Sequence, residues 1–218
     1  MQVPSFVGKS MTMVDWYFDF ISPYAYFGLP LLKGLPAEAE VRYQPILLAG
    51  LLNHWGQKGP AEIPPKRVWT YRACVWWAKQ HGVPFKMPAA HPFNSLPYLR
   101  LCIAAGNTPA AIQTIFEALW TTGGDPADPG TLAALVAQLG VPPERLAEAG
   151  VKEALRANTA QAVQRGVFGV PTLFLQGQAF WGSDAVDFAA AFLANPQLFE
   201  AGEFKRADTL PIGVARKV

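Results

Sequence analysis

The chain has 218 residues, of which 51% are hydrophobic and only 16% are charged, and its formal net charge at pH 7 is +2. A sequence of this length and hydrophobicity can bury one good-sized core, which excludes an intrinsically disordered chain. The small net charge argues against a nucleic-acid partner, because such proteins need a marked basic surface.

The cysteines and the N-terminus give no sign of export. Cys74 and Cys102 are the only cysteines, and they form neither a disulfide framework nor a zinc spacing. The three histidines also lack paired ligand spacing, so no metal site is expected. Residues 1–13 lack the apolar run of a signal peptide, and no segment has the length of a membrane span. We therefore expect a soluble, cytoplasmic protein.

The chain opens with a predicted strand, helix and strand. Residues 11–20 alternate and are rich in aromatic side chains, which is typical of a strand. Ser22 and Pro23 combine an N-cap residue with a first-turn proline, so a helix is predicted from there to Gly34. Residues 40–45 form a second short strand. This order implies a parallel pair of strands joined by a crossover.

The middle of the chain is predicted to be mostly helical. A loop rich in Gly and Pro covers residues 56–65, and a second loop covers residues 87–97. The predicted helices cover residues 65–81, 96–106, 109–121, 131–139 and 143–165. The first of these helices is apolar nearly all round, so at least one of its faces is expected in the core.

The last third of the chain returns to strands. Residues 170–175 form a predicted strand, Gly177-Gln178 a tight hairpin turn, and residues 179–181 a short returning strand. A helix from about Asp184 to Leu193 follows. No clear periodicity is present after Glu200, and the basic side chains there have no assigned role: Lys205, Arg206, Arg216 and Lys217.

The order of elements is β-α-β, a helical block, and then β-β-α. The fold class is therefore α/β, with a thioredoxin-like layout that carries a large all-helical insertion. On this interpretation residues 11–49 and 166–200 form a thioredoxin-like domain, residues 50–165 a helical insertion domain, and residues 201–218 a C-terminal tail.

Ser22 is the first candidate for chemistry. In a thiol–disulfide oxidoreductase the window Ser22–Ala25 would read Cys-x-x-Cys, so no redox pair remains here. A strand-to-helix junction presents free backbone N–H groups and the positive end of the helix dipole, which together stabilise an anion. The Ser22 hydroxyl can donate a hydrogen bond to a thiolate from another molecule. Equally, Ser22 can be only the N-cap of the helix.

Val170-Pro171 is the second candidate. Proline lacks the N–H donor and suits the start of a strand. If the peptide bond is cis, the backbone groups of Val170 would point outward and could pair with an extended peptide, whereas an ordinary trans proline carries no such function.

Gly182-Ser183-Asp184 is the third candidate, because it lies before the last predicted helix. Asp184 can cap that helix. Alternatively, Asp184 can bind an ammonium group while Ser183 and nearby N–H groups hold a carboxylate. A γ-glutamyl end carries both groups on one carbon and would suit the second arrangement.

Three motifs carry a resemblance to a known family. DFISPYAY at residues 19–26, FGVPTLF at 168–174 and FWGSD at 180–184 resemble, in order and spacing, the 2-hydroxychromene-2-carboxylate isomerase family. That family is similar to kappa-class glutathione transferases and DsbA-like proteins, and the resemblance covers about residues 14–193. It implies an enzyme that interconverts 2-hydroxychromene-2-carboxylate and trans-o-hydroxybenzylidenepyruvate through a transient glutathione adduct. It also implies glutathione as cofactor and a homodimer.

The resemblance implies a role for each motif. The glutathione sulfur would lie at Ser22, and the cysteinyl backbone would pair with Val170 beside a cis Pro171. The pair Phe93-Asn94 in HPFNSLP matches a family loop over the same cleft, with Asn94 as a polar contact. The γ-glutamyl end would lie near Trp181, Gly182, Ser183 and Asp184.

The sequence departs from the family on the substrate side. Isomerase-type members often carry a lysine just before the Gly-rich loop, used on the substrate carboxylate, but this region reads LLNHWGQKGP. Where some members have an Asn-Arg pair, residues 61–64 read AEIP. Trp55, Trp76 and Trp77 are candidates for an aromatic wall, with core packing as the alternative for each of them. The candidate substrate contacts are Tyr24, Asn53, His54 and Lys66.

Two other functions stay open. A kappa-type glutathione transferase would use the same serine and thiolate to conjugate electrophiles. A thioredoxin-like module would bind glutathione or an extended peptide without chemistry. The expected partners are glutathione and a small electrophilic substrate, with neither nucleic acid nor membrane. His91, in the HPFN loop, would be either a cleft residue or an ordinary surface histidine.

Overall fold

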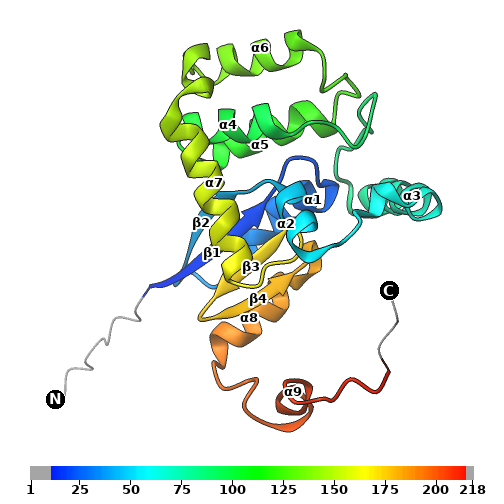
Figure 1. Cartoon of the computed structure of the whole chain (residues 1–218), viewed down its shortest axis with the longest axis vertical. Helices are drawn as coiled ribbons and strands as arrows, with labels where there is room; N and C mark the ends of the chain where they lie inside the picture. The colour runs from blue at the N-terminus through cyan, green and yellow to red at the C-terminus, as the bar shows by residue number, and fades with distance from the viewer. Residues whose placement is uncertain (1–10, 215–218) are drawn as a thin grey trace, which may run out of the picture.

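A mixed four-stranded sheet lies at the centre of the computed structural model, which describes residues 11–214 (Figure 1). The strands lie across the sheet in the order β2 (Ala39–Pro45), β1 (Thr12–Phe18), β3 (Thr172–Leu175) and β4 (Gln178–Trp181). β1 pairs in parallel with β2, and β3 runs antiparallel to both β1 and β4. The predicted parallel pair and the predicted hairpin are confirmed, and the layout is thioredoxin-like.

Helices surround this sheet. The α-helices are α1 (Pro23–Leu31), α2 (Leu48–Trp55), α3 (Pro64–His81), α4 (Leu96–Ala104), α5 (Pro109–Trp120), α6 (Pro129–Gln138), α7 (Ala149–Gln164), α8 (Val186–Ala194) and α9 (Gly202–Ala207). Short 3-10 helices are η1 (Leu32–Gly34), η2 (Pro60–Glu62), η3 (Pro143–Ala147) and η4 (Ser183–Ala185). Figure 1 shows α4, α5 and α6 gathered beyond one end of the sheet, with α7 returning from them toward it.

The two faces of β1 are buried in two different clusters. Val14, Trp16 and Phe18 belong to a large hydrophobic cluster that also contains residues of α1, α8 and the helices of the insertion. Tyr17 points the other way and joins a smaller cluster with Leu51 of α2 and residues of α7. Helices therefore cover both faces of the sheet, which explains why β1 is apolar at nearly every position.

Helix α2 has no local sequence signal. The residue at its N-cap position is Leu47, whose side chain makes no capping hydrogen bond. Instead, the backbone N–H of Leu48 donates to Oδ2 of Asp19 at 2.8 Å. Because the cap comes from a residue 29 positions away, the start signals of a helix are absent from the sequence around it.

Two predicted boundaries are wrong. The helix predicted over 143–165 is divided into η3 and α7, since Glu148 between them has an extended backbone with φ −57° and ψ 143°. The hairpin turn consists of Gln176 and Gly177, with φ values of 46° and 81°, rather than Gly177 and Gln178. A two-residue hairpin of this type needs positive φ at both central positions, which glycine adopts readily.

The short helix α9 follows Glu200, where no periodicity indicates one. Nζ of Lys205 lies 3.6 Å from a carboxylate oxygen of Glu200, and Arg206 forms an ion pair within the helix. Arg216 and Lys217, like the first ten residues, lie outside the described part of the chain.

Helix α3 buries a narrower face than its composition indicates. Thr70, Cys74 and Ala78 are buried, whereas Trp69 and Trp76 are 67% and 62% exposed. The expected core face is therefore confirmed, but core packing of Trp76 is wrong. Within residues 11–214, no helix combines the length and the apolar character needed to cross a membrane.

Candidate active site

Ser22 lies at the junction between β1 and α1, with only 7% of its surface exposed. Its backbone is extended, and its Oγ accepts a hydrogen bond from the N–H of Ala25 at 3.3 Å, so the N-cap interpretation is confirmed. Pro23 has no N–H, and the N–H of Tyr24 lies in the first turn, where the helix offers it no acceptor. The positive end of α1 thus lies at Ser22, where it favours an anion.

The Ser22 hydroxyl also reaches the second predicted segment. Its Oγ donates to the carbonyl oxygen of Val170 at 3.4 Å, across 148 positions in the sequence. The Val170–Pro171 peptide bond is cis, as the resemblance implies, and β3 begins at the next residue. The carbonyl expected to face an extended peptide therefore already has a partner. A hydrogen bond of 3.4 Å is long and weak, so the hydroxyl can turn toward a better acceptor.

The third predicted segment, Gly182–Asp184, lies against the second. The N–H of Gly182 donates to the carbonyl oxygen of Pro171 at 2.9 Å. A Cβ added to Gly28 of α1 would lie 3.4 Å from Cγ of Pro171 and 3.7 Å from Cα of Ser183. Helix α1 therefore packs closely on both segments, and the structure brings the three predicted motifs together.

Asp184 does not cap α8. Asp184 lies within η4. The N-cap position of α8 is Ala185, where no side chain makes a capping hydrogen bond. Gly182 has a φ of 117°, which residues with side chains rarely adopt, and a Cβ there would collide with Oδ1 of Asp184. The exposed Asp184 carboxylate thus folds back over Gly182. The capping interpretation is wrong, and the carboxylate is accessible to a cationic group.

Asp19 places a buried carboxyl group next to the Ser22 turn. It is 1% exposed, and its oxygens accept hydrogen bonds from the N–H of Ile21 at 3.1 Å and of Leu48 at 2.8 Å. Burial raises the pKa of Asp19 to about 6, although hydrogen bonds, including one from the Ser95 hydroxyl, lower it. One carboxyl group therefore connects the β1–α1 loop, the start of α2 and the start of α4.

The candidate substrate contacts lie in two different environments. Tyr24 is half-buried between α1 and α3, and burial together with the neighbouring Cys74 thiol raises its pKa to about 12. Asn53 and His54 are exposed in the last turn of α2, and Lys66 is exposed in the first turn of α3. Only Tyr24 is therefore fixed by packing.

The Phe93-Asn94 pair lies in the loop before α4. Phe93 is half-buried against Tyr98 and Trp120, with ring centroids 6.3 and 6.1 Å away. Asn94 is exposed, and its Oδ1 accepts a hydrogen bond from the N–H of Leu96 at 3.1 Å. The oxygen of Asn94 thus holds the start of α4, and its amide nitrogen is left to meet a ligand.

Exposed aromatic rings border the cis peptide. Trp181 is 57% exposed and packs edge-on against Phe168, with ring centroids 5.2 Å apart. A Cβ added to Gly169 would lie 2.6 Å from Nε1 of Trp181, so the indole covers the backbone just before the cis bond. Trp55 donates from Nε1 to the carbonyl oxygen of Val167 at 3.0 Å and is held beside the same segment.

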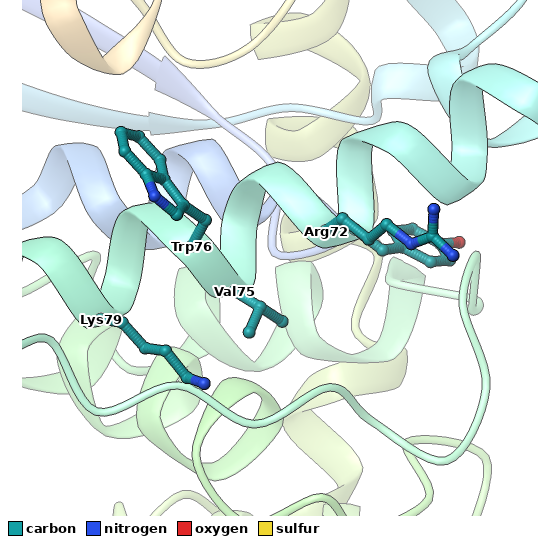
Figure 2. Close-up of a pocket in the computed structure, with 5 residues that line it drawn as sticks. Arg72, Val75, Trp76 and Lys79 are labelled. Atoms are coloured by element: carbon teal, nitrogen blue, oxygen red, sulfur yellow. The ribbon is translucent and has the colours of Figure 1, made fainter.

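Two surface cavities lie away from Ser22. Figure 2 shows the first, of about 350 Å³, on α3, where it is lined by Tyr71, Arg72, Val75, Trp76 and Lys79. The second, of about 250 Å³, lies at the C-terminal end of α1 beside Ser183. Neither is lined by Ser22 or Val170. Trp76 therefore belongs to an outer surface, whereas Trp77 is half-buried and stacks on Phe27 at 4.5 Å.

Two further residues hold the turn that carries Ser22. Nε2 of His91 lies 2.8 Å from the carbonyl oxygen of Ile21, and Nε1 of Trp120 donates to the carbonyl oxygen of Phe20 at 2.9 Å. The surface interpretation of His91 is therefore wrong. These partners lie 70 and 100 positions from the turn, so local sequence patterns carry no signal for them.

This arrangement can stabilise an anion but supplies no thiolate of its own. Burial raises the pKa of Cys74 to about 11 and also raises that of Cys102, so both buried thiols stay protonated at neutral pH. Ser22 offers one hydroxyl donor at the positive end of α1. The site is therefore suited to a thiolate that arrives on another molecule.

Known proteins resemble this chain over most of its length. Residues 13–194 match the family model described as DSBA-like thioredoxin domain. A 2-hydroxychromene-2-carboxylate isomerase of Sphingobium xenophagum is 32% identical over 192 residues, which cover 84% of this chain and 98% of that protein. Glutathione S-transferase kappa 2 of Caenorhabditis elegans is 27% identical over 211 residues, which cover 84% of this chain and 92% of that protein. A solved 2-hydroxychromene-2-carboxylate isomerase structure superposes with a TM-score of 0.72 at 26% identity, covering 91% of this chain and all of that chain.

Proposed function

Since the chain belongs to the DSBA-like thioredoxin domain family, we propose that it is a glutathione-dependent isomerase. The proposed reaction interconverts 2-hydroxychromene-2-carboxylate and trans-o-hydroxybenzylidenepyruvate. The observation that carries the proposal is the meeting of the Ser22 hydroxyl with the Val170 carbonyl at the positive end of α1, in a turn without cysteine. Relatives named as isomerases support the reaction, and relatives named as glutathione transferases support the cofactor.

The residues at the turn fit the sulfur of glutathione. When bound, glutathione supplies a thiolate nucleophile. The Ser22 hydroxyl can leave its long bond to Val170 and donate to that sulfur. The first turn of α1 adds a free N–H at Tyr24 and the positive end of the helix dipole, and both lower the pKa of a thiol placed there. These residues thus raise the population of the nucleophile at neutral pH.

The remaining motifs fit the rest of the cofactor. The backbone at Val170, beside cis Pro171, would pair with the cysteinyl residue in the manner of strand addition. The exposed Asp184 carboxylate would hold the γ-glutamyl ammonium group, and Ser183 would hold its carboxylate. Phe93 and Asn94 would lie over the same cleft, with Asn94 as a polar contact, and Trp181 would lie beside the γ-glutamyl end.

The substrate would lie on the side of Tyr24, between α1 and α3. Its carboxylate would be held by one of the exposed polar groups near the ends of α2 and α3, namely Asn53, His54 or Lys66. A cation or an amide group can donate hydrogen bonds to a carboxylate, so these groups suit that role. Single substitutions at these positions should raise KM for the substrate without changing KM for glutathione.

The proposal is tested by binding and by product analysis. Glutathione should raise the melting temperature in proportion to the logarithm of its concentration, and S-methylglutathione should raise it less. Purified protein should interconvert the two aromatic acids with no loss of glutathione. No shift in melting temperature with millimolar glutathione would contradict the proposal.

A kappa-type transferase is the second candidate, because a kappa-class protein is 27% identical over 84% of this chain. In that case glutathione disappears and a stable conjugate accumulates. Binding without either reaction would indicate a thioredoxin-like binding module. One chromatographic assay that follows the two aromatic acids, glutathione and any conjugate therefore separates the three functions.

We also infer a homodimer that works in the reducing cytoplasm. Two buried free thiols and no cystine among the described residues support the compartment, and the family resemblance supports the dimer. Sedimentation of the purified chain measures the assembly directly.

A further inference from the structure

His91 joins the Ser22 turn to helix α3. Its Nε2 lies 2.8 Å from the carbonyl oxygen of Ile21, and its Nδ1 lies 2.7 Å from the hydroxyl of Tyr71. The carbonyl of Ile21 and the N–H of Ser22 belong to one planar peptide unit. That N–H donates to the backbone carbonyl of Asp19 at 3.1 Å. Both ends of the peptide that carries Ser22 are therefore held, and His91 holds one of them.

The partners of His91 determine where its proton lies. A carbonyl oxygen can only accept, so Nε2 must carry a hydrogen to bond to Ile21. In the neutral ring Nδ1 is then an acceptor, and the hydroxyl of Tyr71 donates to it. The geometry thus selects one of the two neutral tautomers.

Aromatic rings partly shield the imidazole from water. The ring centroids of Phe93 and Trp120 lie 5.8 and 5.5 Å from that of His91. Burial lowers the pKa of His91, although the hydrogen bond to Ile21 raises it. The neutral form is therefore the one present at neutral pH.

Tyr71 is the titratable side chain that contacts His91, and charged groups nearby act on the two partners of the imidazole. From the β1–α1 loop, Asp19 accepts a hydrogen bond from the N–H of Ile21. From α3 come Tyr71 and, one turn earlier, Arg67, which lowers the pKa of Tyr71 against the effect of burial. The neighbouring loop and α5 contribute the aromatic rings of Phe93 and Trp120.

We propose that His91 is a positioning residue for Ser22. With its proton on Nε2, it orients the Ile21–Ser22 peptide and couples that peptide to Tyr71 of α3. The same helix carries Lys66 in its first turn, so the link sets the substrate side relative to the thiolate side. The inference rests on the proposed function, because it concerns the same serine.

Acid does not break this link. When His91 gains a proton on Nδ1, that nitrogen donates to the oxygen of Tyr71. The hydroxyl of Tyr71 can then donate to the carbonyl oxygen of His91, which lies 2.9 Å away. No heavy atom has to move, so protonation adds a positive charge beside the turn and keeps the peptide in place.

The first test is the tautomer itself, read from long-range ¹H–¹⁵N spectra of the imidazole rings. The chain has three histidines, of which His54 and His81 are exposed references, and His91→Gln assigns the third. We expect His91 at neutral pH as a single Nε2–H tautomer. Tyr71→Phe removes the donor to Nδ1 and should shift the Nδ1 resonance, while the carbonyl of Ile21 keeps the proton on Nε2. A proton on Nδ1 in the unmodified protein would overturn the proposal.

The second test is a matched pair of substitutions. The amide nitrogen of His91→Gln reaches the position of Nε2, whereas that of His91→Asn reaches only the position of Nδ1. We expect the glutamine variant to keep kcat within about threefold and the asparagine variant to lose at least about tenfold, with little change in KM for glutathione. A role in packing alone would lower both melting temperatures and leave the two kcat values equal, which would overturn the proposal.

The two tests keep this inference separate from the proposed function. If the unmodified protein neither binds glutathione nor isomerises, the proposed function fails. The tautomer and its response to Tyr71→Phe then decide the link alone. A spectrum unchanged by Tyr71→Phe would overturn it.

Discussion

The hydroxyl of Ser22 has two neighbours in this structure, and neither of them uses it fully. It accepts from the N–H of Ala25 as an N-cap, and it donates to Val170 through a long bond. Capping needs only the lone pairs of the oxygen, so the proton of the hydroxyl remains available for another acceptor. The same hydroxyl can therefore cap the helix and donate a hydrogen bond to a thiolate.

Ser22→Ala should separate these roles when it is compared with Thr108→Ala. Thr108 caps α5 in the same way, accepting from the N–H of Ala111 at 3.2 Å. Each change should lower the free energy of unfolding by about 1 kcal/mol, because each removes one N-cap. Only Ser22→Ala should also lower kcat, by roughly a hundredfold, because it removes a donor to the nucleophile. Equal kcat in both variants would contradict the role of Ser22.

Asp19 should make stability fall as pH rises. Its pKa is raised from 3.8 to about 6 by burial, so the folded protein binds this proton more tightly than the unfolded chain. The stabilisation is complete below the unfolded pKa and is lost as pH rises through the folded pKa. The difference between the two pKa values corresponds to about 3 kcal/mol in the free energy of unfolding.

Asp19→Asn tests this prediction by urea unfolding at a series of pH values. The difference in unfolding free energy should shift in favour of the variant by up to about 3 kcal/mol between about pH 4 and pH 7. Asp187→Asn, which changes an exposed carboxylate in the first turn of α8, serves as the control. A difference that stays constant with pH would contradict the raised pKa.

The candidate site was only partly readable from the sequence, and the reason is spatial. Ser22, Val170 and Gly182 each carry a local signal, because a cap, a proline at a strand start and a glycine before a helix restrict the backbone locally. Asp19 and His91 act through bonds to residues 29 and 70 positions away, and no local pattern marks such bonds.

At the scale of elements, the helical region holds the turn that carries Ser22. Trp120 of α5 and His91 bind the two carbonyl groups of Phe20 and Ile21, and Asp19 connects the turn to α2 and α4. The carbonyl groups of Phe20 and Ile21 and the carboxyl group of Asp19 thereby have partners from other elements. A site held in this way needs little reorganisation when it meets a transition state.

Trp120→Phe tests the contribution of α5 to this arrangement. The change keeps an aromatic ring but removes the Nε1 donor and leaves the buried carbonyl of Phe20 without a partner. We expect a loss of about 2–4 kcal/mol in unfolding free energy, together with a lower kcat. Trp76→Phe makes the same chemical change at a side chain that is 62% exposed, and it should stay within about 0.5 kcal/mol. Equal effects of the two changes would contradict the prediction.

The elements with strong local signals were predicted well. The two parallel strands have alternating patterns. Helices α1 and α5 each begin with a capping residue that is followed by a proline. Helix α2 was missed because Asp19 caps it from a distance, and α3 was judged too apolar because Trp69 and Trp76 lie at the surface. Composition measures apolar content, but tertiary packing decides which side of a helix is buried.

On the scale of the whole molecule, both ends of the helical region are fastened to the same face of the sheet. The N–H of Leu47 before α2 donates to Thr159 of α7 at 3.1 Å, and Asn158 donates to the carbonyl of Pro45 at 3.2 Å. One continuous hydrophobic cluster joins β1 to α4, α5 and α6. The division into a thioredoxin-like domain and an insertion domain stays a prediction, and the two parts share the larger hydrophobic cluster.

A buried carboxylate completes this fastening where α7 ends. Asp15 of β1 is 3% exposed and accepts from Arg42 of β2 at 2.7 Å and from Arg165, just after α7, at 2.6 Å. Burial alone would raise the pKa of Asp15, but the hydrogen bonds from Arg42, Arg165 and Gln44 outweigh burial and lower it. Its contribution is therefore present above the ordinary value of 3.8 and is lost as pH falls through the lower folded value.

The two arginines should contribute unequally to the free energy of unfolding. Comparing them tests whether Arg165 holds the segment that leads to Val170. The Arg165 side chain is 29% exposed, also donates to Tyr17 at 2.9 Å and lies over the ring of Phe174, whereas Arg42 is 48% exposed. Arg165→Met should therefore cost about 2 kcal/mol and Arg42→Met less than about 1 kcal/mol, since solvent weakens the more exposed pair. Because Arg165 precedes the segment that reaches Val170, Arg165→Met should also weaken glutathione binding, which calorimetry measures. If Arg42→Met proves the more costly change, the fastening at the end of α7 does not work as described.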